Sequence, residues 1–238
     1  MSSSQTAILV FSHRPEREWQ NKQLVRKDRS KSRAVADALY RHTLQSVEAS
    51  GLPVLPVTDE RQRGDGFGPR LANAVADAFA DGYDRVIVVG SDCPRLHEVN
   101  WTEVVAHLDA GRPVLGPTPG QAGAYLIGLT RVHFEADAFA QLPWQSPALF
   151  EALERHLAGR AGTASARLDP RDDVNSHDEL VALVRRSIAG VVGLAAVLRR
   201  ILGRAVAAGV TGRPADRHVL GSDRSRAPPA RLGAFADR

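Results

Sequence analysis

An acidic residue that follows a buried apolar run is the first feature of this sequence that could do chemistry. The stretch "VIVVGSDCPRL", residues 86–96, begins with four β-branched residues and continues through Gly90 and Ser91 to Asp92. Such a run is typical of a central strand that is buried on both faces. Ligands of open α/β sheets bind outside the carboxyl ends of the strands, so Asp92 is a candidate ligand-binding carboxylate. The alternative is that Asp92 caps the turn before the next helix.

Two further oxygen-bearing side chains lie late in the chain. Asp173 and Asn175 belong to "DPRDDVNSHDEL", residues 169–180, between the last expected strand and the helix that follows it. Hard cations such as Mg²⁺ or Mn²⁺ take oxygen ligands and are often completed by phosphates and water. Asp92 with Asp173 or Asn175 would supply such an incomplete shell.

Cationic groups that could meet phosphates lie on two polar loops. Arg14 and Lys22 belong to the basic segment 13–33, and Arg70 ends the glycine-rich segment "RQRGDGFGPR", residues 61–70. Arginine and lysine side chains bind phosphates, and so do the backbone N–H groups that begin a helix. The alternative for each cation is a solvated surface charge.

Several common catalytic patterns do not occur in the sequence. It has no Walker A segment, no GxGxxG after the first expected strand and no GxSxG elbow. The eight histidines include no HxxxH pair, and the single cysteine, Cys93, is expected to be a small packed residue. These absences argue against a P-loop enzyme, a conventional dinucleotide site and a serine hydrolase.

The candidate residues are positioned by strands that alternate with helices. Strands are expected at residues 6–12, 52–58, 85–92, 112–118, 119–129 and 165–169, and helices at 34–50, 71–82, 100–111, 146–159 and 176–186. This alternation indicates βαβ units and an α/β fold with a mainly parallel sheet.

Composition and charge exclude some classes of protein. One cysteine permits no internal disulfide, and no targeting segment or membrane span is recognised, so a cytoplasmic protein is expected. Residues 181–238 hold eleven Arg and three Asp with no Lys or Glu, a net charge of +8, so residues 1–180 carry −4 of the total of +4. Since only the C-terminal part is basic, no specific nucleic-acid partner is expected.

Three blocks of the sequence together resemble a known family. They are "GDGFGPRLANAVADAFADGYDRVIVVGSDCPRL", "VLGPTPGQAGAYLIGL" and "LPWQSPALFEALERHL". Over roughly residues 6–183 they resemble bacterial GT-A-like transferases, often described as arsenosugar-biosynthesis glycosyltransferases and grouped with nucleotide-diphospho-sugar transferases. The resemblance implies a three-layer α/β/α sandwich with a Rossmann-like sheet. It also implies a nucleotide-sugar donor, a small-molecule acceptor, and Asp92 holding a divalent cation against the diphosphate; Ser91 and Gly123 are candidate donor-binding residues.

The sequence departs from the family pattern at two places. The usual Asp-Gly-Gly is Gln121-Ala122-Gly123, and the late Asp-Val-Asp is Asp173-Val174-Asn175. Gln121 and Asp173 are the candidate catalytic positions, and the loss of an acid at Gln121 is expected to weaken catalysis. Asn175 still offers an oxygen ligand.

Three functions fit these residues. The first is a glycosyltransferase that uses a nucleotide-diphospho-sugar and Mg²⁺ or Mn²⁺. The second is a nucleotidyltransferase that acts on a small phosphorylated metabolite, and the third is a catalytically degenerate nucleotide-binding protein.

The C-terminal part is expected to differ from the transferase domain, residues 1–183. Residues 184–205 are expected to form a basic amphipathic helix, and residues 206–238 a disordered tail rich in Arg, Pro and Gly. The apolar face of segment 182–205 can lie on an anionic membrane surface, bind a protein partner or pack on the same chain.

Overall fold

The central sheet of the computed structural model carries the candidate residues at one edge. The structure describes residues 5–14, 24–26, 28–121, 123–186 and 191–203. Within them six strands pair in the order β2-β1-β3-β5-β4-β6. The strands are β1 Thr6–Phe11, β2 Val54–Val57, β3 Arg85–Val89, β4 Val114–Pro117, β5 Ala124–Thr130 and β6 Ala166–Arg167. β5 is antiparallel to both of its neighbours, and the other pairs are parallel, which confirms the expected mainly parallel α/β sheet.

Both faces of the sheet are buried, as the apolar strand sequences predict. Along β3, Val86 and Val88 contribute to one hydrophobic cluster, while Ile87 and Val89 contribute to the other. Side chains alternate between the faces of a strand, so the apolar residues 86–89 require a helical layer on each side of the sheet.

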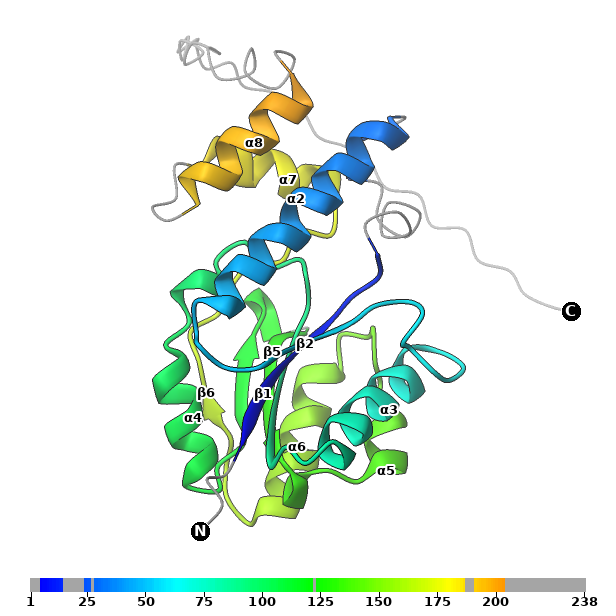
Figure 1. Ribbon diagram of the computed structural model, residues 1–238, viewed down its shortest axis with the longest axis vertical. Coiled ribbons are helices and arrows are strands. Elements are labelled where there is room, and N and C mark those ends of the chain that lie inside the picture. The colour runs from blue at the N-terminus through cyan, green and yellow to red at the C-terminus, as the bar shows by residue number, and fades with distance from the viewer. Residues whose placement is uncertain (1–4, 15–23, 27, 122, 187–190, 204–238) are drawn as a thin grey trace, which may run out of the picture.

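Helices supply these two layers (Figure 1). On one face lie α3 Phe67–Ala80, α5 Ala136–Ala140 and α6 Leu149–Ala161, and on the other lie α4 Trp101–Asp109 and the C-terminal half of α2 Arg29–Glu48. Short 3₁₀ segments, η1 Leu96–Glu98, η2 Pro119–Gln121 and η3 Arg131–His133, connect some of these elements. The result is the three-layer sandwich expected from the sequence.

A third hydrophobic cluster joins the N-terminal half of α2 to α7 His177–Arg185 and α8 Val192–Leu202. Val35 and Leu39 of α2 pack there with Leu183 of α7 and with Leu198 of α8. Figure 1 shows these helices side by side beyond the end of the sheet. We call this group the helical layer.

The observed helices differ from the sequence expectations at two places. α2 begins at Arg29 rather than at residue 34, because the Asp28 side chain accepts a hydrogen bond from the Lys31 backbone N–H and caps the helix inside the basic segment. In place of one helix over residues 184–205, α7 ends at Arg185, Arg186 is extended, and α8 begins at Val192. The buried residues of α8 are Leu194, Ala195, Leu198 and Leu202, so one face of this helix packs inward. The tail, residues 206–238, lies outside the described residues.

None of the described helices combines the length and the hydropathy of a membrane-spanning segment. The buried face of α8 supports packing on the same chain, and a contact of segment 182–205 with a membrane or a protein stays a prediction.

Candidate functional site

Most of the predicted site residues line one cavity. It has a volume of about 640 Å³ and lies at the carboxyl ends of β1 and β3, as expected for an open α/β sheet. Six of the residues proposed from the sequence line it: Arg70, Ser91, Asp92, Gly123, Asp173 and Asn175. We call it the edge cavity.

Asp92 is held at this edge by its own loop and by the segment that follows β6. A Cβ atom built on Gly90 would lie 2.7 Å from Asp92 Oδ1, so the absence of a side chain at Gly90 makes room for the carboxylate. The Asp92 carbonyl accepts a hydrogen bond of 2.8 Å from the Val174 backbone N–H, and Val174 is buried. This bond brings Asp173 and Asn175 to Asp92 although they lie about eighty residues later in the chain.

The neighbouring cysteine is not available as a nucleophile. Burial raises the pKa of the Cys93 thiol, and the negative charges of Asp173 and Asp92 raise it further. The thiol therefore stays protonated, as expected for a packed residue.

One wall of the edge cavity is the start of α3. Gly66 has φ 92° at the N-cap, a conformation that favours glycine, and no side chain caps this helix end. Gly68 is also required, because a Cβ there would lie 2.1 Å from the Ala140 carbonyl oxygen and 2.6 Å from Trp144. Arg70 follows in the same turn and its Nε donates to the Gly66 carbonyl at 2.9 Å. The glycine-rich segment thus brings a helix N-terminus and one guanidinium to the cavity.

His13, Gln62, Tyr125 and Trp144 are among the lining residues that were not singled out from the sequence. His13 Nδ1 lies 2.7 Å from Asp59 Oδ1, and Gln62 Nε2 donates to the Ser12 and Val57 carbonyls at 2.9 and 3.2 Å, which ties the ends of β1 and β2 together. The only signal for His13 and Gln62 was their position just after predicted strands.

Tyr125 and Trp144 have fixed orientations at the cavity. Burial raises the pKa of Tyr125 to about 12, and its hydroxyl donates to the Asp169 carbonyl at 3.1 Å. Trp144 Nε1 donates to the Phe139 carbonyl at 2.9 Å, and its ring lies 5.5 Å from that of Phe67. These groups shape the cavity with aromatic surface.

Arg14 is not brought to the cavity, and the structure does not describe Lys22 or the side chain of Gln121. The Arg14 guanidinium pairs with the exposed Glu60, and Arg14 does not line the cavity, because its backbone N–H is held by Asp59 Oδ2 at 2.8 Å. Lys22 lies outside the described residues. Gln121 ends η2 in the turn before β5, but its side chain is outside the described part of the structure.

The oxygen donors of the cavity suit a hard cation. Asp92, Asp173 and Asn175 offer two carboxylates and one amide oxygen, the ligand chemistry that Mg²⁺ or Mn²⁺ prefers. Among the described residues no group of three or more His, Cys, Asp and Glu side chains is arranged to hold a metal ion. A cation held by Asp92, Asp173 or Asn175 would therefore have to complete its shell with substrate and water.

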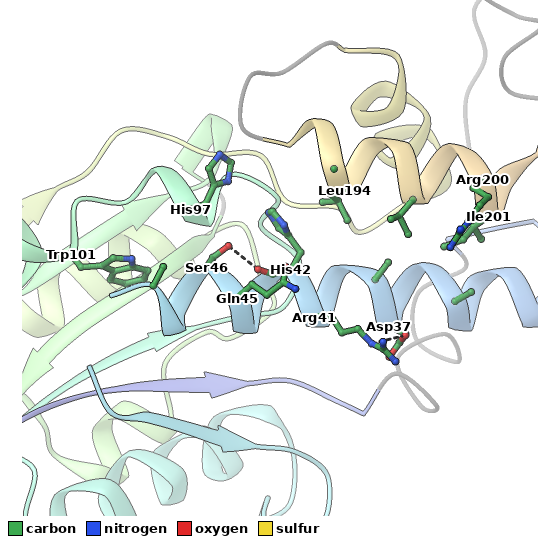
Figure 2. Close-up of a pocket in the computed structure, with 15 residues that line it drawn as sticks. Asp37, Arg41, His42, Gln45, Ser46, His97, Trp101, Leu194, Arg200 and Ile201 are labelled. Atoms are coloured by element: carbon green, nitrogen blue, oxygen red, sulfur yellow. Dashed lines mark hydrogen bonds and ion pairs between the residues drawn. The ribbon is translucent and has the colours of Figure 1, made fainter. Parts of the chain in front are cut away.

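A larger cavity of about 850 Å³ lies elsewhere, between α2 and α8 (Figure 2). Its lining includes His42, His97 and Trp101, and the imidazoles of His42 and His97 both lie within hydrogen-bond distance of the Pro94 carbonyl, at 2.7 and 3.2 Å. None of the predicted site residues that the structure describes lines this groove, so it is not part of the candidate site.

Comparison with solved structures identifies the class of fold. A proposed nucleotide-diphospho-sugar transferase from Desulfovibrio desulfuricans is 22% identical, with a TM-score of 0.67 over 83% of this chain and 95% of that one. Rv0371c from Mycobacterium tuberculosis is 18% identical, with a TM-score of 0.47 over 77% of this chain and 98% of that one. A CMP:2-keto-3-deoxy-manno-octonic acid synthetase is 13% identical, with a TM-score of 0.38 over 76% of this chain and 97% of that one. The first of these similarities shows that the chain has a nucleotide-diphospho-sugar transferase-like fold.

The chain belongs to the family described as "Uncharacterized protein conserved in bacteria" (DUF2064), whose model matches residues 26–146. This match and the fold confirm the resemblance found in the sequence. No curated protein matches the chain.

Proposed function

We propose that this protein transfers a sugar from a nucleotide-diphospho-sugar to a small acceptor, with a divalent cation in the edge cavity. The observation that carries the proposal is the gathering of Asp92, Asp173, Asn175 and Arg70 around one cavity at the carboxyl edge of the sheet. A volume of about 640 Å³ is within the range of ligand sites.

The charges of the cavity support a cation between protein and diphosphate. Two carboxylates would repel a diphosphate directly, and a cation bound by Asp92 and Asn175 would remove this repulsion and supply charge neutralisation of the leaving group. Arg70 and the uncapped N-terminus of α3 would bind phosphate oxygens from the opposite wall. Tyr125 and Trp144 would exclude water from the bound donor.

The proposal is tested with Mn²⁺ and a panel of labelled nucleotide sugars and nucleoside triphosphates. Release of a nucleoside diphosphate is expected. Release of pyrophosphate would instead favour the nucleotidyltransferase, and binding without turnover would favour the degenerate binding protein.

Substitution of the principal candidate ligand gives a sharper test. Asp92→Asn should weaken Mn²⁺-dependent nucleotide binding by at least tenfold, about 1.4 kcal/mol, because an amide is a poorer cation ligand than a carboxylate. Its Tm should stay within a few degrees of the wild type. Asp81→Asn, at the exposed end of α3 far from the cavity, is the matched control and should bind normally. Equal calorimetric binding by both variants would contradict the assignment of Asp92.

A further inference from the structure

The helix α8 has a side that the helical layer does not cover. Its buried leucines belong to that layer, and they fall on one side of the helix. The other side carries six exposed residues: Val192, Gly193, Ala196, Val197, Arg199 and Arg200. At 100° per residue these six positions span an arc of about 160°. We call them the outward face of α8.

Exposed apolar side chains gather on the outward face of α8. Among the described residues, the large apolar side chains that are exposed are Val192 (67%), Val197 (38%) and Val132 (70%), and the first two belong to α8. Ala196 follows Val192 by about one helical turn and extends the same surface. Grouped apolar residues on a surface mark contact sites, whereas single ones need no explanation.

The apolar surface of α8 continues into the groove between α2 and α8 (Figure 2). Gly193 and Val197 line the groove together with Ala38 of α2 and Ile201 of α8, and Arg200 lines it beside Ile201. An occupant that lies on this side of α8 therefore meets apolar surface with a guanidinium at its border.

The charges around the outward face are all positive. Residues 181–203 hold four arginines and no acidic residue. Arg199 Nη2 donates to the Val184 carbonyl at 2.8 Å, which places Arg199 beside the end of α7, where Arg185 is also exposed. The outward face and the end of α7 thus form one positively charged surface.

Most of this positive charge is not neutralised by neighbouring side chains. Arg186 Nη1 lies 3.3 Å from Asp172 Oδ2, but no carboxylate of the described residues pairs with Arg185, Arg199 or Arg200. In the whole sequence residues 181–238 carry a net charge of +8, while residues 1–180 carry −4. The positive charge therefore lies on the same part of the chain as the exposed valines.

This combination of side chains fits an anionic lipid surface better than a nucleic acid. The outward face has no aromatic side chain for stacking on bases and no amide or hydroxyl group for reading their edges. On a lipid surface, by contrast, apolar side chains lie among the acyl chains and arginines reach the phosphates of the head groups.

We propose that the outward face of α8 docks on a membrane that contains anionic lipids. Val192, Ala196 and Val197 enter the interface, while Arg199 and Arg200 bind head-group phosphates. Because the apolar surface is small, attraction between the arginines and the lipids supplies part of the binding, which is reversible and weakened by salt. The helical layer lies at one end of the molecule, so a docked protein keeps its sheet away from the lipid (Figure 1).

The insertion of α8 is tested with a fluorescent label. Cys93 is only 2% exposed, so one introduced cysteine takes an environment-sensitive fluorophore. Val192→Cys carries the label on the outward face, and Val132→Cys, at an equally exposed valine of η3, is the matched control. We expect vesicles of phosphatidylcholine and phosphatidylglycerol in equal parts to shift the emission to the blue at position 192 alone. Pure phosphatidylcholine should give a much smaller shift.

The contribution of charge is tested by co-sedimentation of the full chain with the same vesicles. Arg200→Glu should lower the partition coefficient at least tenfold, because it removes two units of positive charge from the lipid contact. Arg155→Glu, an equal change of charge at an exposed position of α6, is the control and should stay within about threefold of the wild type. Binding by the wild type should fall when the salt concentration is raised.

Several results would overturn the docking surface. These are no spectral shift at position 192, equal shifts at positions 192 and 132, or equal vesicle binding by the two arginine variants. A wild-type protein that binds a single-stranded oligonucleotide but no anionic vesicles, with oligonucleotide binding lost in Arg200→Glu, would assign the positive surface to nucleic acid instead. None of these measurements depends on turnover in the edge cavity.

Discussion

The carboxylate of Asp92 lies in the space that a side chain on Gly90 would need. A methyl group at position 90 would lie 2.7 Å from Asp92 Oδ1, closer than real Cβ contacts occur. The carboxylate must turn away if the methyl is added. The orientation of the candidate cation ligand therefore depends on a residue that itself has no functional group.

Gly90→Ala should impair binding more than stability. We expect Mn²⁺-dependent nucleotide affinity to fall about tenfold, roughly 1.4 kcal/mol, because the carboxylate moves from its position at the cavity. Isothermal calorimetry measures the affinity. Gly159→Ala, in the interior of α6 with open space around its Cβ position, is the control and should leave binding unchanged while stabilising the protein by up to about 1 kcal/mol. Normal nucleotide binding by Gly90→Ala would show that the Asp92 orientation is not needed.

Individual residues of the site were predictable where the strand pattern fixed them. Asp92 follows the most apolar strand, and its place at the sheet edge followed from the topology alone. The orientation of Arg14 was not predictable, because it depends on Asp59 and Glu60, which reach it from the loop after β2. Trp144 was also missed as a cavity residue, since its position depends on packing against α3 and α5.

At the scale of elements, α8 is held by the apolar face that the sequence indicated. Leu198 is fully buried in the helical layer, while Val197 beside it is 38% exposed at the groove of Figure 2. Arg199 Nη2 also donates to the Val184 carbonyl at 2.8 Å, near the end of α7. The helix thus joins the body of the protein through one face and one side-chain bond.

Leu198→Ala should destabilise the protein by about 2–5 kcal/mol, because it removes buried contacts and leaves a cavity. Val197→Ala, the neighbouring control, should cost less than about 1 kcal/mol. Urea unfolding followed by circular dichroism gives both values. Similar small losses for the two variants would mean that the helical layer contributes little to the stability of the fold.

The sequence predicted most strands and helices of the sandwich but not the helical layer. The spacing of apolar residues within one strand or helix predicts which of its faces is buried. The helical layer instead joins residues 24–39 to residues 174–202. A local sequence pattern does not predict which distant segment an apolar face packs against. The start of α2 was also missed, because the charged residues 29–33 resemble a polar loop although Asp28 caps the helix before them.

For the whole molecule, one buried and two half-buried histidines make the free energy of unfolding depend on pH. Burial lowers the pKa of His42, His133 and His156 below the ordinary value of about 6.5. The unfolded chain therefore binds more protons than the native protein as the pH falls below about 6.5. By linkage, the free energy of unfolding must decrease in that direction.

Urea unfolding at pH 7.5, 6.5 and 5.5 should show this decrease. Hydrogen bonds lower the pKa values of Glu98 and Glu135, so these residues lose their contribution to stability only below about pH 4.5. A change in stability between pH 7.5 and 5.5 is therefore assigned to the histidines. His156→Phe removes one of the three titrating groups and should reduce the pH dependence. Equal stability of the wild type at pH 7.5 and 5.5 would contradict the prediction.

The single helix α2 belongs to two hydrophobic clusters at once. Val35 and Leu39 pack in the helical layer, and Val47 packs against the sheet. Backbone amides exchange their hydrogens through the opening that exposes them with least free energy. The Leu39 amide should therefore report opening of the helical layer and the Val47 amide opening of the sheet.

In Leu198→Ala, hydrogen exchange by NMR should be faster at Leu39 than in the wild type, with a much smaller change at Val47. An equal acceleration at both amides would instead show that the two clusters open together, so that one continuous helix makes a single cooperative unit of the whole protein.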